Sequence, residues 1–154
     1  MQLSLGQKDS HVDITEGNAR ISLCETSVLL NDYVIDFPGE YERSLIFAEV
    51  RETQSGLIWI LTMEGKTIIY LPTSTTVASL EALRDINNKD MVIFPANEAL
   101  WKTLETWEVS VAVPYGAHTS EFVTKLGQSA EMTPNATLKA VDFESEKTRF
   151  ITLG

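Results

Sequence analysis

The chain is poor in cysteine, histidine and basic residues. Its one cysteine, Cys24, cannot close an internal disulfide and cannot build a zinc site that needs several thiolates. There are 12 lysines and arginines against 22 aspartates and glutamates, which gives a formal net charge of −10. Proteins bind nucleic acids and anionic membranes largely through basic residues, so this balance argues against both as partners.

Long apolar runs are also missing. No stretch approaches the roughly 20 apolar residues that a membrane helix needs. The first ten residues lack the basic and apolar regions of a secretion signal. We therefore expect a cytoplasmic protein in a reducing compartment. Hydrophobic residues make up 44% of the 154 residues, enough for a proper core, and the length suits one domain, residues 1–154.

The first third of the sequence has the pattern of antiparallel strands. Apolar and polar residues mostly alternate from Val12 to Val50, and turns are predicted at 16–18 and 31–32. A period of two places alternate side chains on opposite faces of a sheet. The residues predicted to point inward are Val12, Ile14, Ile21, Leu23, Ile35 and Phe37. Those predicted to face solvent are His11, Asp13, Arg20, Ser22 and Asp36.

After Gly56 the pattern changes to strands that are covered on both faces. Nearly continuous apolar runs occur at 57–61, 67–71, 91–94 and 109–113. Helical spacing of apolar residues follows the last three runs, with capping candidates at Thr75 or Thr76, at Asn97, and at Thr119 or Ser120. Residues 136–153 return to short strands, which we expect to form a hairpin through 144–147.

These patterns predict a mixed α/β fold with three layers. An antiparallel sheet from the amino-terminal half packs on a mixed sheet, and the outer face of the mixed sheet carries the helices. No helical pattern precedes Thr75, and the alternation already makes the outer face of the first sheet polar. The two observations agree on a β/β/α arrangement.

Three stretches carry a family resemblance. They are Leu5-Gly6-Gln7, Ile35-Asp36-Phe37-Pro38-Gly39-Glu40-Tyr41-Glu42 and Gly65-Lys66-Thr67-Ile68-Ile69-Tyr70-Leu71-Pro72-Thr73. In this order they resemble the metallo-β-lactamase-fold hydrolases, and most closely the bacterial metal-dependent hydrolases related to ascorbate-phosphate lactonase. The segment around Pro38 and Glu40 is the most specific match. The resemblance implies a metallo-β-lactamase-like sandwich, here in a reduced form, and a metal-dependent hydrolase ancestry.

The metal ligands that the resemblance implies are replaced in this chain. Gln7 stands where the family has a histidine, and Thr73 stands where it has a metal-bridging aspartate. The later ligand position falls near Tyr115 and Gly116. The family's His-x-His-x-Asp-His loop is absent, because only 11 residues separate Leu23 from Ile35. We therefore expect no metal and no other cofactor.

The histidine count supports this expectation without the family. The chain has only His11 and His118, whereas a catalytic zinc site normally uses three protein ligands. His11 and Asp13 share the polar face of a predicted strand, and we interpret both as ordinary solvated surface.

Three residues remain as candidates for a residual site. His118 follows a buried strand at its carboxyl end, where α/β sheets often bind ligands, although a structural role at a helix start is the more common one. Thr73 occupies the bridging-aspartate position. Glu40 sits in the Pro-Gly-Glu-Tyr segment, where we expect a turn in which its carboxylate accepts backbone N–H groups.

The predicted first sheet also has a candidate contact surface. Leu29 and Val34 are apolar residues out of step with the polar face, one on each side of the turn at 31–32. We expect them to form a patch through which the chain forms a homodimer or binds another protein.

The function we predict is non-catalytic binding of a protein or a ligand by a pseudo-enzyme that retains the hydrolase scaffold. A first alternative is a metal-dependent hydrolase of lactones or phosphate esters with relocated ligands centred on His118. A second is a structural subunit that a partner chain completes.

Overall fold

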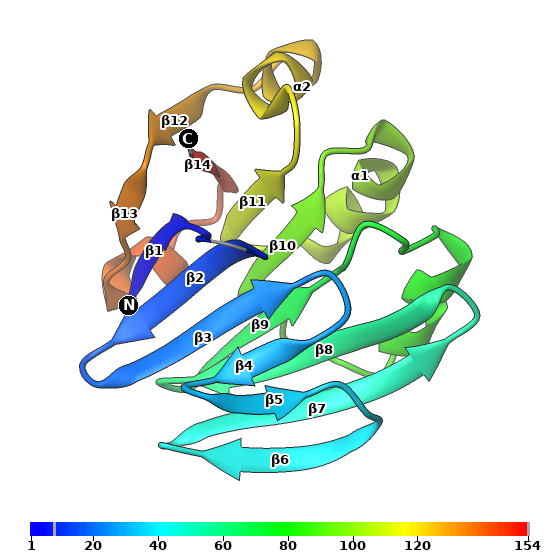
Figure 1. Ribbon diagram of the computed structural model, residues 1–154. Coiled ribbons are helices and arrows are strands. Elements are labelled where there is room, and N and C mark those ends of the chain that lie inside the picture. Colours follow the sequence, from blue (N-terminus) through cyan, green and yellow to red (C-terminus); the bar gives the residue numbers. More distant parts are fainter. Residues whose placement is uncertain (8, 154) are drawn as a thin grey trace.

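Two β-sheets face one another in the computed structural model, which describes residues 1–7 and 9–153 (Figure 1). The first sheet has six antiparallel strands in the order β13-β1-β2-β3-β4-β5. Its strands are β1 (Gln2–Leu5), β2 (Ser10–Glu16), β3 (Ala19–Cys24), β4 (Val28–Leu30), β5 (Tyr33–Ile35) and β13 (Asn135–Thr137).

The second sheet has eight strands in the order β12-β14-β11-β10-β9-β8-β7-β6. Strands β6 to β9 pair antiparallel, and β9 to β12 with β14 pair parallel, so the sheet is mixed as predicted. Its strands are β6 (Gly39–Arg43), β7 (Ile46–Thr53), β8 (Gly56–Met63), β9 (Lys66–Tyr70), β10 (Met91–Pro95), β11 (Val111–Tyr115), β12 (Ala130–Thr133) and β14 (Arg149–Leu153).

All helices of the described residues follow residue 77 and are short. They are the 3₁₀ helices η1 (Ala78–Leu83), η2 (Glu105–Trp107) and η3 (Ala140–Phe143) and the α-helices α1 (Glu98–Leu104) and α2 (Thr119–Lys125). Asn97 caps α1 as predicted, because its side-chain oxygen accepts the N–H groups of Ala99 and Leu100. In α2 the capping position is His118, not Thr119 or Ser120. None of these helices is long and apolar enough to cross a membrane.

The apolar side chains form two cores on the two faces of the second sheet. One core lies between the sheets and includes Ile21 and Leu23 of the first sheet with Trp59 and Ile68 of the second. The other lies between the second sheet and η1, α1, η2 and α2, and includes Leu100 of α1. Phe143 of η3 instead packs against the core between the sheets. The predicted β/β/α layering is confirmed.

The alternating run from 12 to 50 divides between both sheets, which the pattern did not predict. The chain leaves the first sheet after β5 and enters the second at β6. Phe37 lies in this crossing, so its side chain is exposed instead of buried. At the other end, β13 joins the first sheet and β14 the second, so the predicted terminal hairpin is wrong.

Asp13 is the second error in the predicted faces. It lies on the outward side of β2, beside Ser22 of β3, yet it is buried. The guanidinium of Arg20 covers it and donates to its Oδ2 at 2.6 Å. Its Oδ1 has no hydrogen-bond partner among the described residues. Alternation correctly predicts that the side chain of Asp13 points outward. It does not predict that the side chain is buried, because a long arginine on a neighbouring strand can lie across it.

The first helical pattern yields only η1, which depends on a contact to the second sheet. Arg51 of β7 donates to both carboxylate oxygens of Asp85, at 2.6 and 3.0 Å, and to the carbonyl of Ala82 at 2.6 Å. The hydrogen bonds to Asp85 and to Glu49 raise the pKa of Arg51 above its usual range. The bidentate contact holds the segment after η1 against the strand.

The layering generates a stability prediction. Ile21→Ala should reduce the free energy of unfolding by about 2–5 kcal/mol in urea titrations, because its fully buried side chain leaves a cavity in the inter-sheet core. Ser22→Ala, on the opposite face of the same strand, should change it little. Arg20→Ala is a poor control because it uncovers Asp13. A larger loss for Ser22→Ala than for Ile21→Ala would mean that the faces of β3 are exchanged.

Candidate functional site

The carboxyl ends of β9 and β11 meet the first sheet at one place. Because β9, β10 and β11 are parallel, their ends lie at the same edge of the second sheet, where α/β proteins commonly place ligands. Thr73 follows β9, Tyr115 ends β11, His11 comes from β2, and Glu25 directly follows β3. We call these four residues the His11 cluster.

Glu25 is the centre of the His11 cluster. Its Oε2 accepts the hydroxyl of Thr73 at 2.7 Å, the backbone N–H of Thr73 at 3.2 Å, and Nε2 of His11 at 3.0 Å. An ionised carboxylate can only accept, so the proton of the His11 contact belongs to Nε2. Three hydrogens therefore point at one oxygen.

These bonds change the acidity of Glu25. Partial burial raises the pKa of its carboxyl, but the hydrogen bonds from Thr73 and His11 and the charge of His11 outweigh it. The net result is a pKa below the ordinary value of 4.5. The cluster thus keeps a negative charge at the end of β3.

Two tyrosines lie near Glu25 and bond to the backbone of its surroundings. The ring of Tyr115 stacks on that of His11 with centroids 4.3 Å apart, and its hydroxyl donates to the carbonyl of Leu71 at 2.7 Å. The hydroxyl of Tyr70 donates to the carbonyl of Cys24 at 2.7 Å. Burial raises the pKa of both phenols, so they stay protonated. A pocket of about 220 Å³ remains beside the stacked rings of His11 and Tyr115.

The cluster does not have the order of a nucleophilic site. The hydroxyl of Thr73 donates to Glu25, and Glu25 lies between Thr73 and His11. A base-activated hydroxyl needs the histidine next to it, oriented by the acid from the other side. This arrangement fixes His11 and Thr73 in place and activates neither.

The donor set does not fit a metal ion either. Zinc sites bring several lone pairs to one point, with three protein ligands in catalytic sites. Here three hydrogens converge on one carboxylate oxygen. Among residues 1–7 and 9–153 no group of three His, Cys, Asp or Glu side chains is arranged to hold an ion.

A groove of about 630 Å³ opens beside Glu25 on the outer face of the first sheet. Gln7, Arg20 and Cys24 line it together with Glu25. Burial raises the pKa of the Cys24 thiol, which is therefore not a reactive thiolate. Of the positions at which the family resemblance implies metal ligands, Thr73 bonds to Glu25 and Tyr115 stacks on His11, and Gln7 lines the same groove as Glu25.

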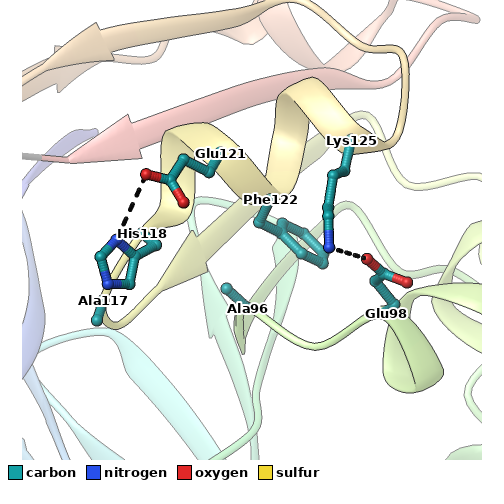
Figure 2. A pocket seen from close by; sticks show the side chains of 7 residues that line it. All are labelled: Ala96, Glu98, Ala117, His118, Glu121, Phe122 and Lys125. Atoms are coloured by element: carbon teal, nitrogen blue, oxygen red, sulfur yellow. Dashed lines mark ion pairs between the residues drawn. The ribbon is translucent and has the colours of Figure 1, made fainter.

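A separate pocket of about 270 Å³ lies at the start of α2, which we call the His118 pocket (Figure 2). Nδ1 of His118 is 3.6 Å from a carboxylate oxygen of Glu121, and Nζ of Lys125 is 3.6 Å from one of Glu98. Figure 2 shows the two pairs on either side of Phe122.

The ion pairs of the His118 pocket are weak. His118 and Glu121 are 76% and 77% exposed, and both distances are too long for good hydrogen bonds. Exposed pairs of this kind contribute little because water screens them. His118 adopts a left-handed backbone with φ of 61°, which turns the chain from β11 into α2. A helix-start role accounts for this residue.

The structure does not bring the three predicted site residues together. Thr73 belongs to the His11 cluster and His118 to its own pocket. Glu40 lies in the edge strand β6, three strands away from β9 in the sheet order, and not in the predicted turn.

His11 and Glu25 are the residues that the sequence analysis missed. The strand pairing shifts register between Ser10 and Val12, and His11 lies at this irregularity, half-buried against Tyr115. Strict alternation cannot predict a bulge. The acidic Glu25 directly after a strand that ends in a turn was the one available signal.

The comparisons with known proteins agree with this architecture. The chain matches no protein-family model and no curated protein sequence. Its structure is similar to the crystal structure of a candidate Zn-dependent hydrolase of the metallo-β-lactamase superfamily from Thermotoga maritima, with a TM-score of 0.74, 13% identity and 99% of each chain covered. The chain therefore has the metallo-β-lactamase-like fold that its sequence resemblance implies.

The His11 cluster generates a prediction about pH. A carboxyl with a lower pKa in the folded than in the unfolded chain stabilises the fold when ionised, and this contribution is lost as pH falls through the folded value. Wild-type stability should therefore fall below about pH 5, and Glu25→Gln should lose less over the same range in urea titrations. Glu144→Gln removes an exposed carboxyl and should follow the wild type. Equal slopes for Glu25→Gln and wild type would contradict the hydrogen bonds at Glu25.

Proposed function

We propose that the protein is a non-catalytic binding protein built on a metallo-β-lactamase-like scaffold. The observation that carries this proposal is the set of hydrogen bonds that Glu25 accepts. At the strand ends where the resemblance implies metal ligands, its carboxylate accepts three hydrogens from His11 and Thr73. Tyr115 packs beneath it with its hydroxyl bonded to the backbone. These side chains bond to one another and to the fold, which leaves none poised for chemistry.

The competing proposal is a metal-dependent hydrolase of lactones or phosphate esters centred on His118. The Thermotoga maritima structure, described as a candidate Zn-dependent hydrolase, is the observation in its favour. The exposure of the candidate ligands argues against this proposal. His118 is exposed, and so are the nearby carboxylates of Glu121 and Glu98. A third proposal is a structural subunit that a partner chain completes. It is also non-catalytic, and it requires a partner chain for a complete structure.

Metal content separates the first two proposals. Protein purified without chelators should contain well below one zinc, iron or manganese ion per chain by mass spectrometry, and added Zn²⁺ or Mn²⁺ should produce no hydrolysis of a nitrophenyl phosphodiester above background. The physical reason is that the chain offers no three convergent ligands among its described residues.

His118→Ala is the informative variant for this test. It removes the histidine of the competing site without touching the His11 cluster. Stoichiometric metal in the wild type that disappears in His118→Ala would overturn the non-catalytic proposal and support the hydrolase. The exposed surface position of His118 means that the variant should fold normally.

The bound partner is either another protein or a second copy. The structure places Leu29 and Val34 directly opposite one another on β4 and β5, with Val34 exposed and Leu29 half-buried. Both lie on the outward side of the first sheet, at its β5 edge. Dimerisation through this patch is still a prediction.

A further inference from the structure

Exposed apolar side chains are concentrated in the segment that contains β5 and β6, which runs along the bottom of Figure 1. Nine large hydrophobic side chains are exposed among the described residues, and four of them fall within residues 32–45. They are Tyr33, Val34, Phe37 and Leu45. We call residues 32–45 the edge strip. Such a concentration in a short segment is typical of an interaction surface.

Side-chain contacts hold the edge strip in one conformation. The guanidinium of Arg43 lies 5.2 Å from the ring centroid of Tyr33. Asn31 Nδ2 is 3.0 Å from Ser44 Oγ and donates to it. The hydroxyl of Tyr41 donates to the carbonyl of Phe37 at 2.6 Å. These contacts join the edge of the first sheet to the edge of the second, so the surface is formed before any partner binds.

Leu45 has the most exposed of the large apolar side chains in the edge strip. It lies in the two-residue turn between β6 and β7, with φ of 65°, and it is 83% exposed. Turns of this length with positive φ at both positions favour asparagine and glycine. A leucine there is strained and gains no burial within the chain. A residue that breaks local rules without compensation suggests a contact outside the chain.

The surroundings of these apolar residues are acidic. Residues 32–45 contain four acids, Asp32, Asp36, Glu40 and Glu42, and one base, Arg43, so the strip carries a formal charge of −3. All four carboxylates are on exposed residues. A complementary surface must therefore be basic as well as apolar.

Strand β6 presents a free edge beside this surface, because the order of the eight-stranded sheet ends there. Glu40 and Glu42 lie two residues apart on one face of β6, on either side of Tyr41. If two copies paired antiparallel about Tyr41, Glu40 of each would lie opposite Glu42 of the other. Like charges directly opposite destabilise a strand pair, so the edge disfavours a second copy.

We propose that the edge strip binds an extended segment of another protein in which lysine or arginine alternates with apolar residues. The segment adds to the free edge of β6, its basic side chains pair with Glu40 and Glu42, and its apolar side chains contact Leu45 and Phe37. This inference rests on the proposed binding role, but its test is independent of metal content. A failure of one is therefore distinguishable from a failure of the other.

The probe is a seven-residue peptide that alternates lysine and valine, with a glutamate–valine peptide as its charge-reversed counterpart. Wild-type protein should bind the basic peptide and not the acidic one in calorimetric titrations. Leu45→Asn and the double variant Glu40→Gln/Glu42→Gln should each weaken binding about tenfold or more. Asparagine tolerates positive φ, so Leu45→Asn should keep the fold. On peptide binding, the backbone amides of Gly39–Arg43 should gain protection from hydrogen exchange.

Matched variants elsewhere test whether the effect is local. Met132→Asn changes an exposed apolar residue on β12, the other edge of the same sheet. Glu144→Gln/Glu146→Gln removes two exposed acids with the same spacing as Glu40 and Glu42. Both should bind the basic peptide like the wild type.

Three results would overturn the proposal. The first is no binding of the basic peptide. The second is equal weakening by the matched variants, which would mean unspecific attraction to a chain of charge −10. The third is a mass of twice 17.2 kDa by light scattering that returns to one chain mass in Leu45→Asn, which would assign the surface to a second copy.

Discussion

The packing of one apolar sheet face against another is the constraint on which the structure depends. The first sheet is apolar on only one side, so it must place that side against the second sheet. The second sheet is apolar on both sides, so it also needs the helices on its other face. This difference explains why η1, α1, η2 and α2 occur among the later strands of the second sheet and why the first sheet has an uncovered polar face. The polar groups that the chain uses at the inter-sheet edge, above all Glu25, are placed by this packing.

The parts of the fold that depend on periodicity could be predicted, and those that depend on long-range contacts could not. Ile14, Ile21 and Leu23 are buried as the alternation predicts. The same alternation continues through β6 and β7, and nothing local shows that the chain changes sheets between Ile35 and Gly39. The pairing of β13 with β1 joins residues more than 130 positions apart, so no local pattern reveals it.

The candidate site shows the same division. The absence of metal-ligand motifs at Gln7 and Thr73 could be read directly from the sequence. The partner of Thr73 could not, because Glu25 reaches it from 48 residues earlier in the chain. The strand face of His11 predicts a solvated side chain, whereas in the structure its ring stacks on Tyr115 beside a register shift. Glu25 accepts hydrogen bonds from residues of both sheets, and sequence patterns do not distinguish a carboxylate held in this way from a catalytic acid.

Two buried aromatic side chains form hydrogen bonds between the two sheets and restrict their relative movement. Trp59 Nε1 of the second sheet donates to the carbonyl of Ile35 at 3.2 Å, and the hydroxyl of Tyr70 donates to that of Cys24 at 2.7 Å. Apolar packing has no preferred direction and would tolerate sliding, but hydrogen bonds are directional and do not. One of these bonds lies at β5 and the other at the end of β3. Sliding of the sheets or opening of the sandwich would therefore break at least one of them. These two hydrogen bonds therefore hold the sheets in one position relative to each other.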